Sequence, residues 1–365
     1  MRGIAAFLVF LFHFHHWIRS PLTDNAFVLN GYLWVDFFFI LSGFVIFHSY
    51  AEKVRSWAEI RQFIVRRFAR LYPLHLFTLF VFVGFEYFAC LVKRPAGAVV
   101  STTVVFFMKH YRSFVANLML ATSMHLSNGL SYNFPSWSIG AEFYTCILFA
   151  LAVRFAGGHG NHRRFFAVSF VLAVSGYVFF YQMLKTLDLT FNFGFLRCLA
   201  GFCLGVSGYA AYRELTGKIS QGTASLAALL SLIAIFTFMS HGIAPSDKFI
   251  MPLIFLFLTV SLALSGDSSF ITRVLMLPKL KWLGARSYSL YLNHAAVIFL
   301  VSILLRRFAF GTSMNIVIQL VSSIALLALS DLTYRQIERR FWSPRTPLTP
   351  ENATALLQPV NDKAA

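Results

Sequence analysis

Long apolar segments alternate with short polar segments along nearly the whole chain. A helix that crosses the hydrocarbon core of a bilayer needs about 20 mainly apolar residues. The pattern predicts such helices at roughly residues 4–17, 31–50, 71–92, 137–156, 166–184, 193–212, 223–241, 249–265, 287–305 and 314–334. We therefore predict an all-α fold, a polytopic transmembrane helical bundle of about ten spans.

One stretch, 93–136, departs from this pattern because each of its apolar parts is too short to cross a bilayer alone. We expect it to form a partly re-entrant external loop. The remaining segments show no internal repeat and no second folded domain. We predict one membrane domain over residues 1–342, followed by a disordered cytoplasmic tail over residues 343–365, which is rich in proline.

Composition supports a membrane protein. Hydrophobic residues make up 58% of the chain and charged residues only 12%, whereas a soluble domain has about 25% charged residues. The net charge of +17 comes from Lys and Arg at the ends of apolar helices, which membrane topology explains better than a nucleic-acid surface does. We therefore expect membrane lipids and no nucleic acid as partners. Placing both termini in the cytoplasm puts most of these residues in inner loops, as membrane topology requires.

An ionisable residue inside a membrane helix costs several kcal/mol and therefore calls for a partner or a task. Three such residues stand out, while Arg154 and Arg197 also lie inside predicted spans. His13 lies about 6 Å and Asp36 and Glu142 about 7.5 Å from the outer end of their helices, at 1.5 Å per residue. A histidine beside a carboxylate is a suitable base for a hydroxyl group. We therefore expect these three residues to share a catalytic site, although each alone is also typical of a helix–helix contact.

Three arginines are candidates for binding an anionic donor. Arg2 and His13 are eleven residues apart and so share one face of the first helix, about 16 Å apart. Arg67 and Arg70 are three residues apart and also share a face, as a phosphate-binding pair would. Anchoring of the inner helix end is the simpler interpretation of that pair. The cysteines show no paired metal spacing, so we expect no metal.

The same residues lie in segments that resemble the acyltransferase-3 family of membrane O-acyltransferases. The order and spacing of the segments agree with the family pattern, and together they cover residues 1 to about 340. They are Arg2–Ala6 followed by His13, Trp34–Phe44, Arg67–Pro73, Pro135–Tyr144 and Leu283–His294.

The resemblance implies that an acyl group, such as acetyl, moves from cytosolic acyl-coenzyme A to a hydroxyl of an extracytoplasmic or lipid-linked carbohydrate. His13 would be the base, oriented by Glu142 or Asp36, and Arg2, Arg67 and Arg70 would bind the donor. The resemblance also implies an integral protein of the bacterial cytoplasmic membrane.

Several alternatives stay open at this point. A proton-coupled transporter would use the same histidine and carboxylates as a relay, and a membrane scaffold would need no chemistry. Ser42 is either a nucleophile or a small packing residue. Trp137 is more typical of an interface anchor than of a stacking surface, and His294 of a helix contact.

Overall fold

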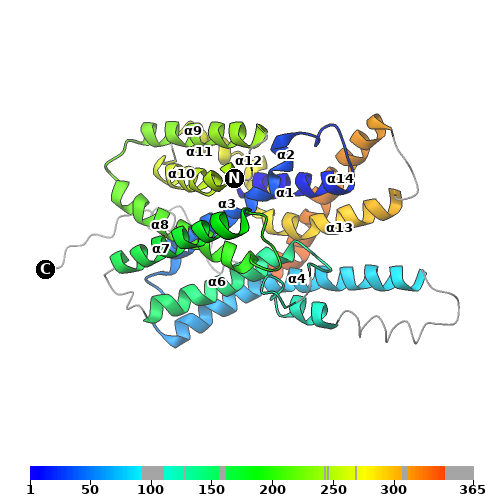
Figure 1. Ribbon diagram of the computed structural model, residues 1–365, viewed down its shortest axis with the longest axis horizontal. Coiled ribbons are helices and arrows are strands. Elements are labelled where there is room, and N and C mark those ends of the chain that lie inside the picture. The colour runs from blue at the N-terminus through cyan, green and yellow to red at the C-terminus, as the bar shows by residue number, and fades with distance from the viewer. Residues whose placement is uncertain are drawn as a thin grey trace.

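The structure is a computed structural model, and it describes residues 1–92, 111–126, 129–155, 162–241, 244, 246–267, 269–305 and 311–341. Within these ranges the ordered elements are helices, and no β-strand is present. The predicted all-α, polytopic bundle is therefore confirmed (Figure 1).

Ten long helical segments correspond to the ten predicted spans. Among the described residues, eight of these segments are long and apolar enough to cross a membrane, and α1 and α13 are the other two. The segments are α1 Arg2–Trp17, α3 Trp34–Tyr50, α4 Trp57–Val92, α6 Ser136–Phe155, α7 His162–Phe179 with η2 Phe180–Leu184, α8 Gly194–Leu215, α9 Gln221–Ser240, η3 Asp247–Ile250 with α10 Met251–Leu264, α13 Ser287–Leu305, and α14 Thr312–Thr333 with η4 Tyr334–Glu338 and α15 Arg339–Phe341.

Short helices connect some of these segments: α2 Ala26–Leu29, η1 Gly31–Leu33, α11 Phe270–Leu275 and α12 Pro278–Ala285. The largest boundary error concerns α4, which begins at Trp57 rather than near residue 71. Its first turns carry Arg and Glu, so an apolar pattern does not reveal them, and the helix continues through Pro73. In the predicted re-entrant loop, residues 111–118 are helical. Residues 93–110 and the tail 343–365 lie outside the described residues.

Helix α3 lies at the centre of the bundle and packs mainly against α8. A Cβ atom added to Gly43 of α3 would lie 2.0 Å from the carbonyl oxygen of Phe202, and one added to Gly205 of α8 would lie 2.0 Å from that of Ile40. Only glycine permits this backbone approach, which is how small residues pack membrane helices. About two thirds of the most apolar part of the α3 segment is buried inside the bundle, against 17% of that of the α7 segment.

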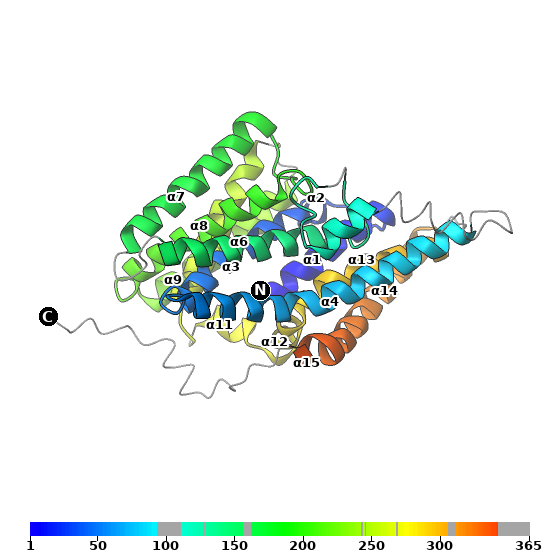
Figure 2. The same cartoon turned by 90° about the horizontal axis from the view of Figure 1, so that it is seen from below.

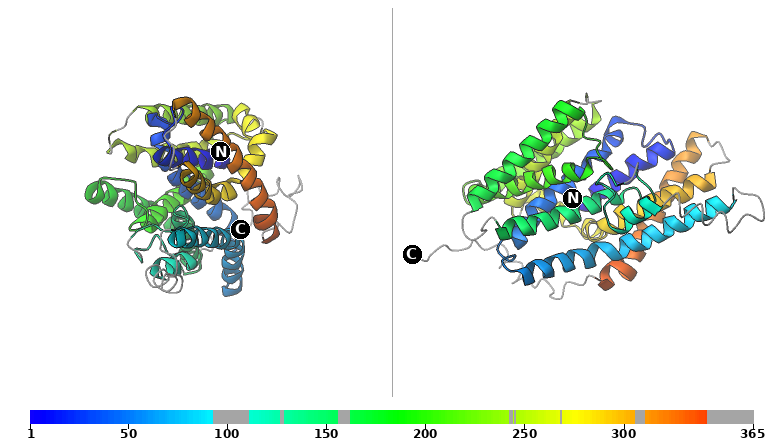
Figure 3. Two further views of the ribbon diagram at one scale, coloured as in Figure 1. Left: turned by 90° about the vertical axis from the view of Figure 1, so that its right-hand side faces the viewer. Right: turned by 60° about the horizontal axis from the view of Figure 1, so that its bottom comes forward.

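The arrangement around α3 decides which helices meet at the site. Helices α7 and α4 lie on opposite sides of the bundle (Figures 2 and 3). Between them, α1 packs along α13 and against α3, while α4 packs against α6 and α13. Helices α1, α4 and α13 run in one direction, and α3 and α6 return in the other (Figure 2). These five helices enclose the site described next.

Candidate active site

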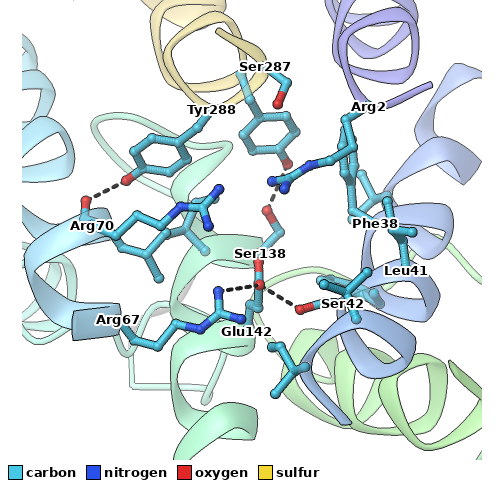
Figure 4. A pocket seen from close by; sticks show the side chains of 17 residues that line it. Arg2, Phe38, Leu41, Ser42, Arg67, Arg70, Ser138, Glu142, Ser287 and Tyr288 are labelled. Carbon is cyan, nitrogen blue, oxygen red and sulfur yellow. Dashed lines mark hydrogen bonds and ion pairs between the residues drawn. The ribbon is translucent and has the colours of Figure 1, made fainter. Parts of the chain in front are cut away.

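A cavity of about 120 Å³ lies between α1, α3, α4, α6 and α13. Arg2 of α1 and Arg67 and Arg70 of α4 line it, and their guanidinium groups reach toward its centre (Figure 4). The three arginines that the sequence analysis assigns to the donor thus line one cavity. The remaining lining is mostly apolar, with hydroxyl groups from Ser42, Ser138, Ser287, Tyr288 and Tyr291.

Glu142 is the carboxylate that lines this cavity. Its Oε1 atom accepts a hydrogen bond from the Ser42 hydroxyl at 2.7 Å and lies 3.7 Å from Arg67 Nη1 (Figure 4). The Arg67 and Glu142 side chains remain 14% and 20% exposed, so the ion pair is accessible from outside the protein. Glu142 therefore orients Arg67, and Ser42 orients Glu142.

A second carboxylate, Glu338, faces the same arginines and was missed by the sequence analysis. It is buried, accepts a hydrogen bond from Ser289 Oγ at 2.8 Å, and interacts electrostatically with Arg70 and Arg2. Glu338 ends the π-helical segment η4, whose wider turn departs from the 3.6-residue period. Its sequence neighbours are basic, so the sequence pattern indicates an ordinary cytoplasmic helix end and not a site residue.

His13 lies outside the lining of this cavity and forms a pair with His294 of α13. His13 Nδ1 lies 3.0 Å from the Val9 carbonyl oxygen and 3.1 Å from His294 Nε2, and the two rings stack with centroids 5.0 Å apart. The Phe134 ring packs edge-on against His13 at 4.9 Å. His294, expected only as a helix contact, is thus the side chain that holds His13.

The predicted carboxylate partner of His13 is wrong. Among the described residues, neither Asp36 nor Glu142 hydrogen-bonds to His13. Both carboxylate oxygens of Asp36 instead bind Arg197, at 2.9 Å to Nε and 2.7 Å to Nη2. The Asp36 and Arg197 side chains are 0% and 1% exposed. The opposite charges neutralise each other inside the bundle, which leaves Asp36 no free oxygen for the imidazole.

The three intramembrane residues therefore have three separate surroundings, although their predicted depths are similar. The position of a residue along its helix gives its depth in the membrane, but the direction in which its side chain points decides which residues it contacts. Trp137, expected as an interface anchor, also has its side chain inside the bundle. Its indole is buried, packs against Phe39, and lies under the Arg197 guanidinium at 5.7 Å.

The cysteines are consistent with packing where their side chains are described. Cys146, Cys198 and Cys203 are free thiols buried in the bundle. Across the described ranges, no group of three or more His, Cys, Asp or Glu is arranged to hold a metal ion.

Comparison with known proteins gives a family match and partial relatives. A family profile described as "Acyltransferase domain" matches residues 1–335. The chain is 38% identical over 93 residues to Protein 2 in the picA locus of Rhizobium radiobacter, covering 25% of this chain and 44% of that protein. It is 33% identical over 127 residues to the acyltransferase MdmB of Streptomyces mycarofaciens, covering 34% of this chain and 29% of that protein.

A longer match is to the peptidoglycan O-acetyltransferase OatA of Listeria monocytogenes, 22% identical over 364 residues, with 93% of this chain and 54% of OatA covered. The chain thus spans about half or less of the length of these curated relatives. No solved structure matches the chain.

Proposed function

Because the chain belongs to the acyltransferase-3 family, whose profile spans residues 1–335, we propose that it is a membrane O-acyltransferase. It moves an acyl group, acetyl in the simplest case, from cytosolic acyl-coenzyme A to a hydroxyl of an extracytoplasmic or lipid-linked sugar. The observation that carries this proposal is the convergence of Arg2, Arg67 and Arg70 on one cavity beside the His13–His294 pair.

The arginine end of the cavity suits a phosphorylated donor. Guanidinium groups bind phosphate oxygens through paired, charge-assisted hydrogen bonds. The three arginines face two carboxylates, Glu142 and Glu338, so an excess of positive charge remains for an anion. Helices α1 and α13 begin beside the cavity, at Arg2 and Ser287, and helix N-termini also attract anions. In our proposal this end faces the cytoplasm, where coenzyme A thioesters are made.

The imidazole end suits deprotonation of an acceptor hydroxyl. The Val9 carbonyl can only accept a hydrogen bond, so the contact with His13 Nδ1 places the proton on Nδ1 and leaves the lone pair on Nε2. His294 Nε2 then accepts from the same Nδ1–H group. His294 thereby takes the orienting role that we had assigned to a carboxylate, and it stabilises the imidazolium that forms.

The reaction follows from these positions. His13 Nε2 takes the proton of the acceptor hydroxyl as its oxygen attacks the thioester carbonyl carbon. A carbon–oxygen bond forms, the carbon–sulfur bond breaks, and the coenzyme A thiolate leaves and recovers the proton from His13. Asp36 contributes as half of a structural ion pair, and Glu142 contributes by positioning Arg67.

The names of the relatives support the class of the acceptor. OatA is described as a peptidoglycan O-acetyltransferase and MdmB as an acyltransferase. A glycan hydroxyl is therefore the acceptor that we propose for this chain.

Purified protein in lipid nanodiscs, supplied with radiolabelled acetyl-coenzyme A, tests the proposal. We expect release of coenzyme A and, with a glycan acceptor present, formation of an acetyl ester. His13→Ala should lower the rate by about 100-fold or more, because base catalysis contributes about 10²–10⁴-fold. His16→Ala is a matched control, since His16 is exposed on the same helix and makes the equivalent contact to the Phe12 carbonyl.

Two results would contradict the proposal. One is wild-type protein that binds no acyl-coenzyme A, and the other is a folded His13→Ala variant that keeps the wild-type rate. The donor end is tested separately with Arg70→Gln, which should raise the KM for the donor far more than it changes kcat.

A further inference from the structure

The donor cavity ends one helical turn before the imidazole pair. On α13, Tyr288 lies among the arginines, Tyr291 lines the cavity one turn further along, and His294 follows after another turn. At 1.5 Å per residue, Tyr288 and His294 are separated by about 9 Å along the helix axis. His13 and His294 are not among the residues that line the cavity.

The antiparallel helices repeat this spacing in reverse. On α6, Glu142 lies at the arginine level and Ser138 lies one turn back, toward Phe134, the residue that packs on His13. On α3, Ser42 bonds to Glu142, and Phe38 lies one turn back. Three helices therefore each place one side chain, Phe38, Ser138 or Tyr291, at a common level between the arginines and the imidazoles. We call these three residues the partition.

Direct contacts hold the partition together. The Tyr291 and Ser138 hydroxyl oxygens are 2.8 Å apart, and the Phe38 ring lies 6.0 Å from the Tyr291 ring. Ser138 Oγ also donates to the Pro135 carbonyl at 3.2 Å, so the proton shared with Tyr291 comes from the tyrosine. The Tyr291 ring also packs against the His294 ring in an edge-to-face arrangement, with centroids 5.6 Å apart. Tyr291 thus lines the cavity and also contacts His294, so it lies between the two.

We propose that Tyr291, supported by Ser138 and Phe38, limits the size of the acyl group that reaches His13, so that only short acyl groups are transferred. This inference rests on the proposed function, since it concerns the thioester end of the same donor. A thioester whose phosphates lie on the arginines must bring its carbonyl past this level to meet the acceptor. Both Tyr291 and Ser138 are buried, so each added methylene must displace packed atoms.

The magnitude follows from how pockets discriminate chain length. One methylene in a tight apolar site changes kcat/KM by about 10- to 200-fold. We expect the wild type to prefer acetyl- over butyryl-coenzyme A by at least about 100-fold. Tyr291→Ala opens the partition and should reduce that preference to below about 10-fold. Tyr291→Phe should keep the preference, because the ring that fills the space remains.

The experiment measures kcat/KM for acetyl-, propionyl-, butyryl- and hexanoyl-coenzyme A with wild type and variants in nanodiscs. Tyr288→Ala is the matched control, since it removes the same ring from the same helix at the arginine level. It should weaken all donors to a similar extent and leave their ratio unchanged. A purely structural role of Tyr291 would likewise lower every rate together, so the ratio separates the two roles.

Phe38→Ala provides a second opening of the partition if Tyr291→Ala does not fold. The inference is overturned if folded variants of both kinds keep the wild-type preference, or if the wild type already uses hexanoyl- as well as acetyl-coenzyme A. In either case the wild type still consumes acyl-coenzyme A, so the proposed function stands. Wild type that uses no acyl-coenzyme A at all would refute the proposed function instead, and the inference with it.

Discussion

Substituting Asp36 by Asn removes one charge of an ion pair that lies entirely inside the bundle. The change keeps the size of the side chain but leaves the Arg197 guanidinium positive among α3, α8 and the segment before α8. Arg197 keeps its hydrogen bonds to the carbonyls of Leu189 and Tyr32, both at 3.3 Å, and its stacking on Trp137. The loss is therefore that of one partner rather than of all contacts.

Breaking a buried ion pair by removing one partner costs about 3–5 kcal/mol. Because Arg197 retains two carbonyl acceptors, we expect the lower end, about 3 kcal/mol, which is about a 100-fold change in the unfolding equilibrium. Removing both charges, with Asp36→Leu and Arg197→Met, should recover at least half of that loss, since no uncompensated charge then stays buried.

The free energy of unfolding is measured by titrating SDS into mixed micelles and following helix content. The proteins compared are the wild type, Asp36→Asn, and the double variant with Asp36→Leu and Arg197→Met. The reasoning fails if Asp36→Asn unfolds with the wild-type free energy. It also fails if that variant is stable but no longer transfers acyl groups, because Asp36 would then act in catalysis, as its sequence position first indicated.

The other expectations concern the site and the packing around it. His294→Leu should lower kcat by about 10- to 100-fold without changing the donor KM, because His13 loses an acceptor for its Nδ1–H group. His294→Gln should recover part of that rate. Steady-state kinetics at varied acetyl-coenzyme A concentrations test both expectations. Glu338→Gln should lower the donor KM and strengthen inhibition by coenzyme A, since a buried negative charge near the arginines is removed, and an unchanged inhibition constant would contradict it. Gly205→Leu should prevent α3 and α8 from packing and lower the yield of folded protein on size-exclusion chromatography, whereas Gly84→Leu, where an added Cβ meets no atom within 4 Å, should not.

The bundle could be predicted from the sequence because each span carries its own signal. An apolar segment of about 20 residues identifies a membrane helix whatever its neighbours are. The position of Arg2, Arg67 and Arg70 at one level was predictable for a related reason, since they lie at the inner ends of the first and third predicted spans. The polar start of α4 was not predictable, because hydropathy does not distinguish a helix that extends into water from a loop.

The partners of the buried polar groups could not be read in the same way. Pairing depends on how each helix is rotated about its axis, and a one-residue change rotates a side chain by about 100°. Asp36 and Arg197 are 161 positions apart, yet both were visible as charges inside predicted spans, so the rule that such charges pair would have found them. His294 and Glu338 gave weaker signals, because one lies in an aromatic motif and the other among basic residues.

The separation of these groups also bears on the rival function, a proton-coupled transporter. A relay needs successive proton carriers within hydrogen-bonding reach. In the described part of the chain Asp36 is occupied by Arg197, Glu142 is held by Ser42 and Arg67, and His13 contacts His294 across the partition from Glu142. The three candidate carriers thus do not form one path. The same separation suits acyl transfer. The phosphates of the donor need a charged site at one level, whereas deprotonation of the acceptor needs an uncharged imidazole at another level. A long thioester can span the distance between these two sites.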